Sequence, residues 1–388
     1  MRFGGKRSTT AVSAAGILVC SSLLAGCDPM LTAVRCGLTA IAESAGPDPQ
    51  PADTRTVTAA VETEPVDDPC DAADDPAIWV NPTDPDESLI VGSNKVRGLL
   101  VYDLDGQIVS RLDSGRINNV DLRPGIRVGG EETIVVAGTN RTTMTLDILA
   151  LDPRTGQLSP LGEPIDPGFA DDPYGLCLYH SAASGGLFVF ANGQDGAVGQ
   201  WRLDADGRGR LTGVEVRRWA VASQPEGCVA DDANGWLFIG EEAAGIWRFD
   251  AEPTASTERP VAVDTTGLGE PQGGRLAADV EGLALYAPPG GRSEDGFLVA
   301  SSQGNHTYVV YDRAPPHAYR GTFRIGGQGA VDGTEETDGI DLVAAPVGAD
   351  YPAGLLVVQD GYNYDTDGAR INQNFKLVSW SDVAFNLR

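Results

Sequence analysis

The stretch DVEGLALY, residues 279–286, places two acids before and at the start of a short apolar strand. Five other segments open in a similar way, about 45 to 58 residues apart, a spacing typical of propellers and solenoids. They are DDPAIW (74–79), NVDL (119–122), DPYGL (172–176), EGCV (226–229) and DGIDL (338–342). The repeat predicts a modular fold in which each unit carries an acid at a similar place.

Each unit continues with the pattern of an antiparallel sheet. A second apolar strand leads into a polar loop, a third strand alternates, and a weaker fourth strand usually follows a Gly or Pro turn. Six such units without intervening helices predict an all-β fold, namely a six-bladed β-propeller with four-stranded antiparallel blades around a central channel. A sandwich or an up-and-down barrel would not repeat its loop chemistry so regularly.

Closing the ring requires the two ends of the domain to meet. The segment RTVTAAVE (55–62) alternates like a strand and precedes the first blade. We expect this N-terminal strand to pair at the outer edge of the last blade and close it, because an open sheet edge exposes unpaired backbone groups.

The N-terminus has the features of a targeting segment. Basic residues precede a short apolar stretch (11–24) that ends in Leu24-Ala25-Gly26-Cys27, which resembles a bacterial lipobox. This predicts a lipoprotein signal peptide over 1–27 with lipidation at Cys27, a flexible tether over 28–53, and a propeller domain over 54–388. The alternative is an ordinary secretory signal with a chance cysteine. Either way the protein is expected to be exported, and the lipobox makes it an anchored cell-envelope lipoprotein.

The other cysteines fit an oxidising compartment. Cys20 would leave with the signal peptide, and an even number then remains beyond the anchor. Similar positions in consecutive repeats favour one disulfide, and the remaining two cysteines would form another. The preferred pairs are Cys177–Cys228 and Cys36–Cys70, with buried free thiols as the alternative.

The charge is strongly acidic, with 55 Asp and Glu against 28 Lys and Arg and a formal net charge of −27. Such a surface repels nucleic acid and anionic lipid, so no nucleic-acid partner is expected and membrane contact is expected only through the anchor. No coiled-coil pattern or apolar face outside the blades is evident, which favours a monomer. The acids either solubilise the surface or form cation sites.

Acids at the start of the inner strands should meet at one mouth of the channel. The strand-start acids are Asp75, Asp121, Asp172, Glu226, Glu281 and Asp338 or Asp341, and Glu241, Glu242, Asp279 and Asp332 lie in loops that could join them. Converging carboxylates repel one another unless cations neutralise them, and Ca²⁺ accepts six to eight oxygen ligands in flexible geometry. With only three histidines, a His-based transition-metal site is disfavoured. The alternative is that propeller strands carry Asp for turns and hydrogen bonds.

Several segments carry a family resemblance. They are DAADDPAIWVNPTDP (71–85), NNVDLR (118–123), DPYGLCLYHS (172–181), EGCVADD (226–232), IGEEAAGIWRF (239–249), DVEGLALY (279–286), LVASSQGN (298–305), TDGID (337–341) and NQNFK (372–376). In this order they resemble the β-propeller phytases, over about residues 54 to 388. The resemblance implies a 3-phytase: calcium-dependent hydrolysis of phytate, myo-inositol hexakisphosphate, to lower inositol phosphates and inorganic phosphate by a metal-activated water.

The same resemblance implies roles for individual residues. The implied calcium ligands are Asp74, Asp75, Glu226, Glu242, Asp279, Glu281, Asp332 and Asp338. The implied catalytic residues are Lys95, Arg141, Tyr174 and Glu226, and Lys95, Arg141 and Tyr174 would also bind substrate. Arginine suits a two-point grip on phosphate.

Two positions depart from the family pattern. Some members have a second lysine after the one at position 95; here Val96 follows, and Arg97 is the candidate to act in its place as a substrate-binding residue. The lysine of a blade-three loop is Gln194 here, so the resemblance implies a weaker grip on substrate, or a changed substrate, at this substrate-binding position.

Two other functions fit the repeat and the acids. A lactonase-like calcium propeller would keep the carboxylates but would have no use for Lys95 and Arg141 at the mouth. A non-catalytic propeller that binds a partner on the cell envelope would hold calcium only as a structural ion.

Overall fold

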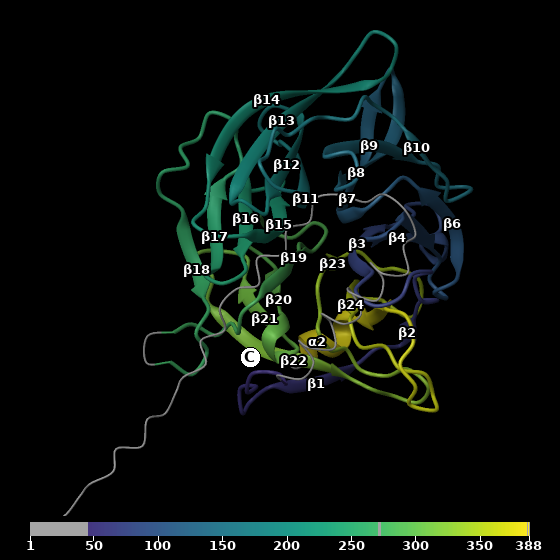
Figure 1. The fold of residues 1–388 in the computed structure, drawn as a ribbon, viewed down its shortest axis with the longest axis vertical. Helices are drawn as coiled ribbons and strands as arrows, with labels where there is room; N and C mark the ends of the chain where they lie inside the picture. The colour runs from purple at the N-terminus through teal and green to yellow at the C-terminus, as the bar shows by residue number, and fades with distance from the viewer. Residues whose placement is uncertain (1–45, 271–272, 386, 388) are drawn as a thin grey trace, which may run out of the picture.

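The computed structural model describes residues 46–388 apart from 271–272, 386 and 388. Six sheets are arranged around a central axis, which confirms the predicted six-bladed, nearly all-β propeller (Figure 1). The signal peptide, Cys27 and Cys36 lie outside the described residues. Among those described, no helix is long and apolar enough to cross a membrane.

The first three blades contain four antiparallel strands each, which follow one another along the chain. Blade one is β3 (Ala73–Trp79), β4 (Leu89–Asn94), β5 (Gly98–Tyr102) and β6 (Ile108–Asp113), with the short 3-10 helix η1 (Pro85–Glu87) between β3 and β4. Blade two is β7 (Ile117–Val128), β8 (Glu131–Asn140), β9 (Thr145–Leu151) and β10 (Leu158–Pro160). Blade three is β11 (Pro173–His180), β12 (Leu187–Gly193), β13 (Ala197–Ala205) and β14 (Leu211–Ala220).

The other three blades follow the same plan, except that blade six takes its fourth strand from the N-terminal segment. Blade four is β15 (Pro225–Asp231), β16 (Trp236–Glu241), β17 (Gly245–Asp250) and β18 (Val261–Thr265). Blade five is β19 (Val280–Tyr286), β20 (Phe297–Ser302), β21 (Thr307–Asp312) and β22 (Tyr319–Gly326), with η2 (Gln303–Asn305) after β20. Blade six is β23 (Ile340–Val343), β24 (Leu355–Asp360) and β25 (Asn374–Ser379), followed by α2 (Trp380–Phe385).

The N-terminal strand closes the ring differently from the prediction. Only β2 (Val61–Glu62) pairs with β25 and completes blade six. The preceding β1 (Arg55–Thr58) pairs in parallel with β22 and adds a fifth strand to blade five, so the prediction that all of 55–62 belongs to the last blade is wrong. Val57 and Ala59 are buried among apolar side chains of both blades, which explains why the segment bridges the two.

The core is divided among the junctions between blades. Six buried apolar clusters are found among the described residues, and each combines side chains from two neighbouring blades. In one of them, Val135 and Ala137 of β8 pack with Leu178 of β11. Burial of apolar surface between blades is the main force that holds a propeller together. It fixes the inner strands in a ring, with β3, β7, β11, β15, β19 and β23 each touching the next.

The cysteine prediction is confirmed where the structure describes it. Cys177 of β11 and Cys228 of β15 form a disulfide that joins blades three and four. Cys70 is disulfide-bonded as well, and its pairing with Cys36 stays a prediction. At the end of the segment predicted as a tether, Asp48 donates its backbone N–H to Gly304 O at 2.6 Å, and Gln50 Nε2 bonds Asn305 O at 2.9 Å.

Candidate active site at the channel mouth

A β-bulge at the start of the inner strands orients the acids of the repeat. In five of the six inner strands the pairing register shifts at the strand start, between Ala73 and Pro76 in β3 and between Pro225 and Cys228 in β15. Such bulges re-orient a side chain relative to the regular alternation. Asp74, Asp75 and Glu226 lie within these shifts, so the repeated sequence motif corresponds to a repeated bulge.

Glycine after the acid lets adjacent blades approach closely. A Cβ at Gly227 would lie 2.1 Å from the backbone oxygen of Glu281 in the next blade. A Cβ at Gly339 would lie 2.5 Å from Cα of Asp75 in blade one, which is the neighbour of blade six in the closed ring. A side chain is therefore excluded at both positions, and the acid-bearing backbones of neighbouring blades are drawn together.

Three glutamates form the centre of the mouth. One carboxylate oxygen from each of Glu226, Glu242 and Glu281 lies within 4.8 Å of the others, a spacing that suits a metal ion. Glu281 is 4% exposed, and its Oε2 is buried without a hydrogen-bond partner among the described residues. Buried polar atoms are nearly always satisfied, so an unpartnered carboxylate oxygen here fits a position for a cation.

The protonation of this cluster reflects its crowding. Burial, followed by repulsion from Glu226 and Glu242, holds the pKa of Glu281 well above its ordinary value. Burial and the charge of Glu226 raise the pKa of Glu242 to about 9. A cation bound among these groups would reverse both shifts, because it favours the ionised form.

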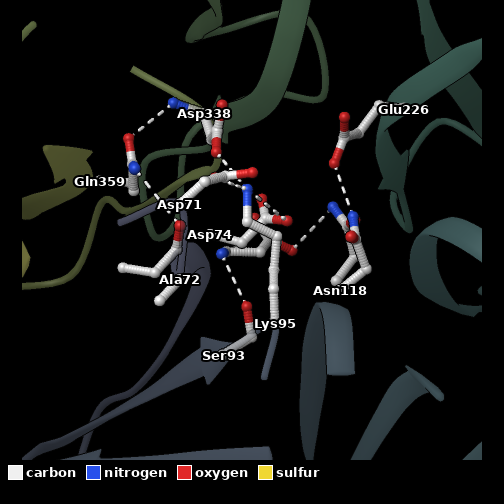
Figure 2. A network of polar contacts seen from close by, with 12 residues as sticks. Asp71, Ala72, Asp74, Ser93, Lys95, Asn118, Glu226, Asp338 and Gln359 are labelled. Atoms are coloured by element: carbon white, nitrogen blue, oxygen red, sulfur yellow. Dashed lines mark hydrogen bonds and ion pairs between the residues drawn. The ribbon is translucent and has the colours of Figure 1, made fainter. Parts of the chain in front are cut away.

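A second group of acids surrounds Lys95 (Figure 2). Its Nζ lies 2.6 Å from Asp71, 2.8 Å from Asp338 and 3.7 Å from Asp74. Burial lowers the pKa of Lys95, but the neighbouring carboxylates outweigh this and raise it overall. Both carboxylate oxygens of Asp74 are buried without hydrogen bonds among the described residues, although one is within ion-pair distance of Lys95. The three carboxylates carry more negative charge than one lysine can balance, so this group can also bind a cation.

Arg141 follows β8 of blade two, and Tyr174 lies in β11 of blade three. Arg141 Nε donates to Asp172 Oδ2 at 2.9 Å, and its Nη1 donates to Asn118 Oδ1 at 2.8 Å. The guanidinium carbon lies 5.4 Å from the centre of the Tyr174 ring, within range of a cation–π contact. Burial and then the charge of Glu226 raise the pKa of Tyr174 further above its ordinary value, so the hydroxyl is a donor at neutral pH.

Asn118 is a site residue that the sequence did not single out. Its Nδ2 donates to Glu226 Oε1 at 2.7 Å while its Oδ1 accepts from Arg141, so one buried amide joins the metal-type cluster to the arginine. Figure 2 shows Asn118 pointing at Glu226. The sequence feature that could have identified Asn118 is its position in NNVDLR (118–123), at the start of the blade-two inner strand, where other blades carry an acid.

Other acids of the inner strands hold neighbouring blades together. Asp75 Oδ2 accepts from Val120 N at 3.1 Å and from Asn119 Nδ2 at 3.2 Å, both in the next blade. Asp121 and Asp341 accept backbone N–H groups of neighbouring blades in the same way. For these acids, the structural role weighed in the sequence analysis is visible in the contacts.

The remaining predicted site residues lie in different places. Asp279 directly precedes β19, and its carbonyl accepts from Gln303 N. Asp332 pairs with the buried Lys376, which also contacts Glu62, and it is not a member of the three-glutamate cluster.

The two positions that depart from the family pattern are also separated. Arg97 binds Asp68 at 3.1 Å. Gln194 follows β12, and its N–H donates to the carbonyl of Asp172 at 3.2 Å. Gln194 therefore lies beside Arg141's partner, whereas Arg97 points to a separate acid.

Known proteins match this chain closely. A model of the phytase family matches residues 30–388. The 3-phytase of Bacillus subtilis (strain 168) is 41% identical over 335 residues, which is 85% of each chain. Among solved structures, BBS1N in complex with ARL6DN covers 74% of both chains at 11% identity and a TM-score of 0.42, and Saccharomyces cerevisiae Sqt1 covers 74% of this chain and 70% of its own at 11% and 0.40. Similarities at that level support no conclusion.

Fold and mouth together define a class, the β-propeller phosphoric monoester hydrolases. Within that class the chain belongs to the phytase family, and it is an enzyme that releases phosphate from phytate. The resemblance stated from the sequence motifs is confirmed, and the lactonase-like and purely binding functions are not favoured. The acidic cluster at the mouth could bind a metal ion.

We expect the metal-free protein to lose stability as the pH rises from about 4.5 to about 9. Burial raises the pKa of Asp338 to about 7, of Asp341 to about 7 and of Glu242 to about 9. The folded state therefore binds more protons than the unfolded state across this window, and its free energy of unfolding falls as the protons leave. Lys95 does not offset this loss. Its raised pKa stabilises the folded state by an amount that is constant at every pH well below the ordinary lysine pKa, so this stabilisation does not change across the window.

The measurement is the thermal unfolding midpoint with a chelator at pH 5 and at pH 8. Calcium added at pH 8 should restore the midpoint, because it replaces the protons as the neutralising charge. Equal midpoints at the two pH values in chelator would contradict the expected repulsion.

Proposed function

We propose that the metal of this phytase is calcium, held by Glu226, Glu242 and Glu281 and, on the Lys95 side, by Asp74 and Asp338. The observation that carries the proposal is the cluster of three close carboxylates with an unpartnered buried oxygen on Glu281. Hard carboxylate oxygens suit calcium, and the described site includes no histidine. We propose several ions, because the three glutamates come from blades four and five, whereas Asp74 and Asp338 come from blades one and six.

The other proposed ligands differ in their support. Asp75 and Asp279 are proposed as peripheral ligands, since Asp75 already accepts hydrogen bonds from blade two. Asp332 would serve only a separate site, together with Glu62.

The side chains at the channel mouth have different proposed roles in binding and hydrolysing the substrate. When bound, calcium would polarise a phosphoryl oxygen and lower the pKa of a water molecule. Arg141 offers a guanidinium to the phosphate and is held in place by Asp172 and Asn118. Tyr174 can donate a hydrogen bond from its hydroxyl to a phosphate oxygen, and Lys95 provides a further positive charge. Glu226, bonded by Asn118, would align the metal relative to the arginine.

Release of inorganic phosphate from phytate at a series of calcium concentrations tests this proposal. We expect release to fall to background in EGTA and to return when calcium is added in excess. Magnesium should restore little activity, because it demands near-ideal octahedral geometry and gives up its water ligands reluctantly, whereas calcium accepts many oxygen ligands in flexible geometry. Undiminished turnover in EGTA would show that the carboxylate cluster does not act through calcium.

The N-terminal features give a further proposal about location. We infer an exported lipoprotein anchored at Cys27, with the tether ending where Asp48 and Gln50 contact the loop after β20. A monomer is proposed for the propeller. Mass spectrometry of the membrane-extracted protein should find an acylated Cys27 at the new N-terminus, and Cys27→Ala should release the protein; an unmodified N-terminus would contradict the anchor.

A further inference from the structure

We propose that Thr139 and Asn192 are positioning residues, which fix Tyr174 and Glu226 of the channel mouth by holding their backbones. The inference rests on the proposed roles of Tyr174 toward the substrate and of Glu226 toward the metal. It starts from a feature that several blades repeat. The bulge at the start of the inner strand takes a backbone N–H out of the regular ladder, and a buried side chain of the second strand accepts that N–H instead.

This accepting side chain occupies the same place in blades one to three. It lies on the second strand, between the two residues that pair with the ends of the bulge. The side chain therefore belongs to the bulge that orients the residues of the mouth. The three contacts are Asp75 N to Ser93 Oγ at 2.9 Å, Asn119 N to Thr139 Oγ1 at 3.0 Å, and Gly175 N to Asn192 Oδ1 at 2.8 Å.

In blade three the peptide group between Tyr174 and Gly175 is held at both of its ends. Thr139 Oγ1, in blade two, donates to Tyr174 O at 2.6 Å. Gly175 N donates to Asn192 Oδ1 in blade three itself. Because the peptide group is planar, two contacts at opposite ends fix its orientation. They thereby fix the direction in which the Tyr174 side chain leaves the backbone, toward Arg141.

Asn192 extends the same constraint to the three-glutamate cluster. Its Nδ2 donates to Glu226 O in blade four at 3.2 Å. A Cβ at Gly175 would lie 1.8 Å from that oxygen, so the two backbones are in close contact. Thr139 is fully buried and Asn192 is 1% exposed, so the loss of either side chain leaves buried backbone groups without a partner. Thr139, this peptide group and Asn192 thus form a relay from blade two to blade four.

Ser88 offers a matched control, because a purely structural role would affect stability alone. Its Oγ accepts from Asn81 N at 3.0 Å and donates to Pro85 O at 2.7 Å, the same kinds of contact that Thr139 makes. Ser88 is fully buried too, but it precedes β4, whereas Lys95 of the mouth follows that strand. Ser88→Ala should therefore lower stability and leave the kinetics of phytate hydrolysis unchanged.

The kinetic test uses Thr139→Val, which keeps the shape of the side chain and removes its hydroxyl. We expect kcat/KM for phytate in excess calcium to fall about tenfold, because a misplaced group at the reacting centre is costly. Thr139→Ser retains the hydroxyl and should stay within about twofold of wild type. In the Tyr174→Phe background, Thr139→Val should cost less than about twofold, since the hydroxyl that it positions is already absent. An equal factor in both backgrounds, or wild-type kinetics in Thr139→Val, would overturn the positioning role.

A second measurement tests the relay without turnover. Amide hydrogen exchange followed by NMR should be at least about tenfold faster at Gly175 in Asn192→Ala than in Ser88→Ala, which carries a similar loss of stability. The calcium concentration that gives half of the thermal stabilisation should rise about tenfold in Asn192→Ala, because Glu226 is no longer held. It should change less than about twofold in Thr139→Val. Unchanged exchange at Gly175, or an unchanged calcium requirement in Asn192→Ala, would overturn the relay.

These outcomes are separate from the proposed function. Failure of wild type to release phosphate from phytate with calcium would overturn the calcium-dependent reaction. The exchange rate at Gly175 would still report on whether Asn192 holds the backbone of the mouth.

Discussion

Glu281→Gln should have opposite effects on stability and activity. In the metal-free protein at pH 8 we expect the free energy of unfolding to rise by about 1 to 3 kcal/mol, because a neutral amide avoids the cost of keeping either a proton or a negative charge on a buried carboxyl. With calcium, phytate hydrolysis should fall by at least about a hundredfold, since a ligand with negative charge is lost. The substitution hardly changes side-chain volume, so packing stays the same.

Two readouts check this result. Thermal unfolding in EGTA gives the stability change, and calcium titration followed by phosphate release gives the loss of metal-dependent activity. A variant that is destabilised in EGTA, or that keeps full activity at ordinary calcium levels, would contradict the assignment of Glu281 to the metal cluster.

Glu241→Gln provides a matched control one residue from Glu242. Glu241 is also buried, but its oxygens accept from Ser223 N at 2.6 Å, Ser223 Oγ at 2.7 Å and Trp247 Nε1 at 2.7 Å. Its carboxylate is satisfied by the protein, so replacing it should lower the free energy of unfolding by about 1 to 2 kcal/mol. Calcium affinity should be unaffected.

Arg141→Ala should lower kcat/KM for phytate by about a hundredfold to a thousandfold, the range for removing a preorganised donor at a reacting group. The stabilisation of the protein by calcium should remain, because the three glutamates are still present. Arg141→Lys should recover only part of the activity, since an ammonium cannot reproduce the two-point grip of a guanidinium.

Steady-state kinetics combined with calcium-dependent unfolding midpoints distinguishes this effect from misfolding. An unchanged midpoint with lost kcat/KM is the expected pattern. Wild-type kinetics in Arg141→Ala would show that Arg141 does not act on the substrate and that Asp172 and Asn118 have a structural role only.

The repeat made much of the site predictable. Acids at one phase of a propeller repeat must meet at one end of the inner strands, so the repeat alone was enough to place Glu226 and Glu281 together. The lysine and arginine of the mouth were identified by resemblance in their loops, and the Cys177–Cys228 disulfide by equal phase in neighbouring repeats.

The repeat by itself did not separate adjacent acids. It left Glu241 and Glu242 equivalent, and only the family resemblance selected Glu242. In the structure Glu241, the last residue of β16, accepts from Trp247, and Glu242 lies in the three-glutamate cluster. Asp332 forms an ion pair with Lys376, and Arg97 forms one with Asp68. Each partner comes from another part of the chain, so the local sequence around Asp332 and Arg97 did not indicate it.

The sequence by itself determined the number of blades, the phase of the acids and the family, because these depend on local alternation and on spacing that repeats along the chain. The tertiary structure decided which carboxylates are satisfied and which are left for a cation, how 55–62 divides between two blades, and that Thr139 and Asn192 hold one peptide group between them. Those outcomes depend on contacts between residues distant in sequence. The energy of a buried charge is set by the groups around it in space, and the order of residues along the chain does not specify them.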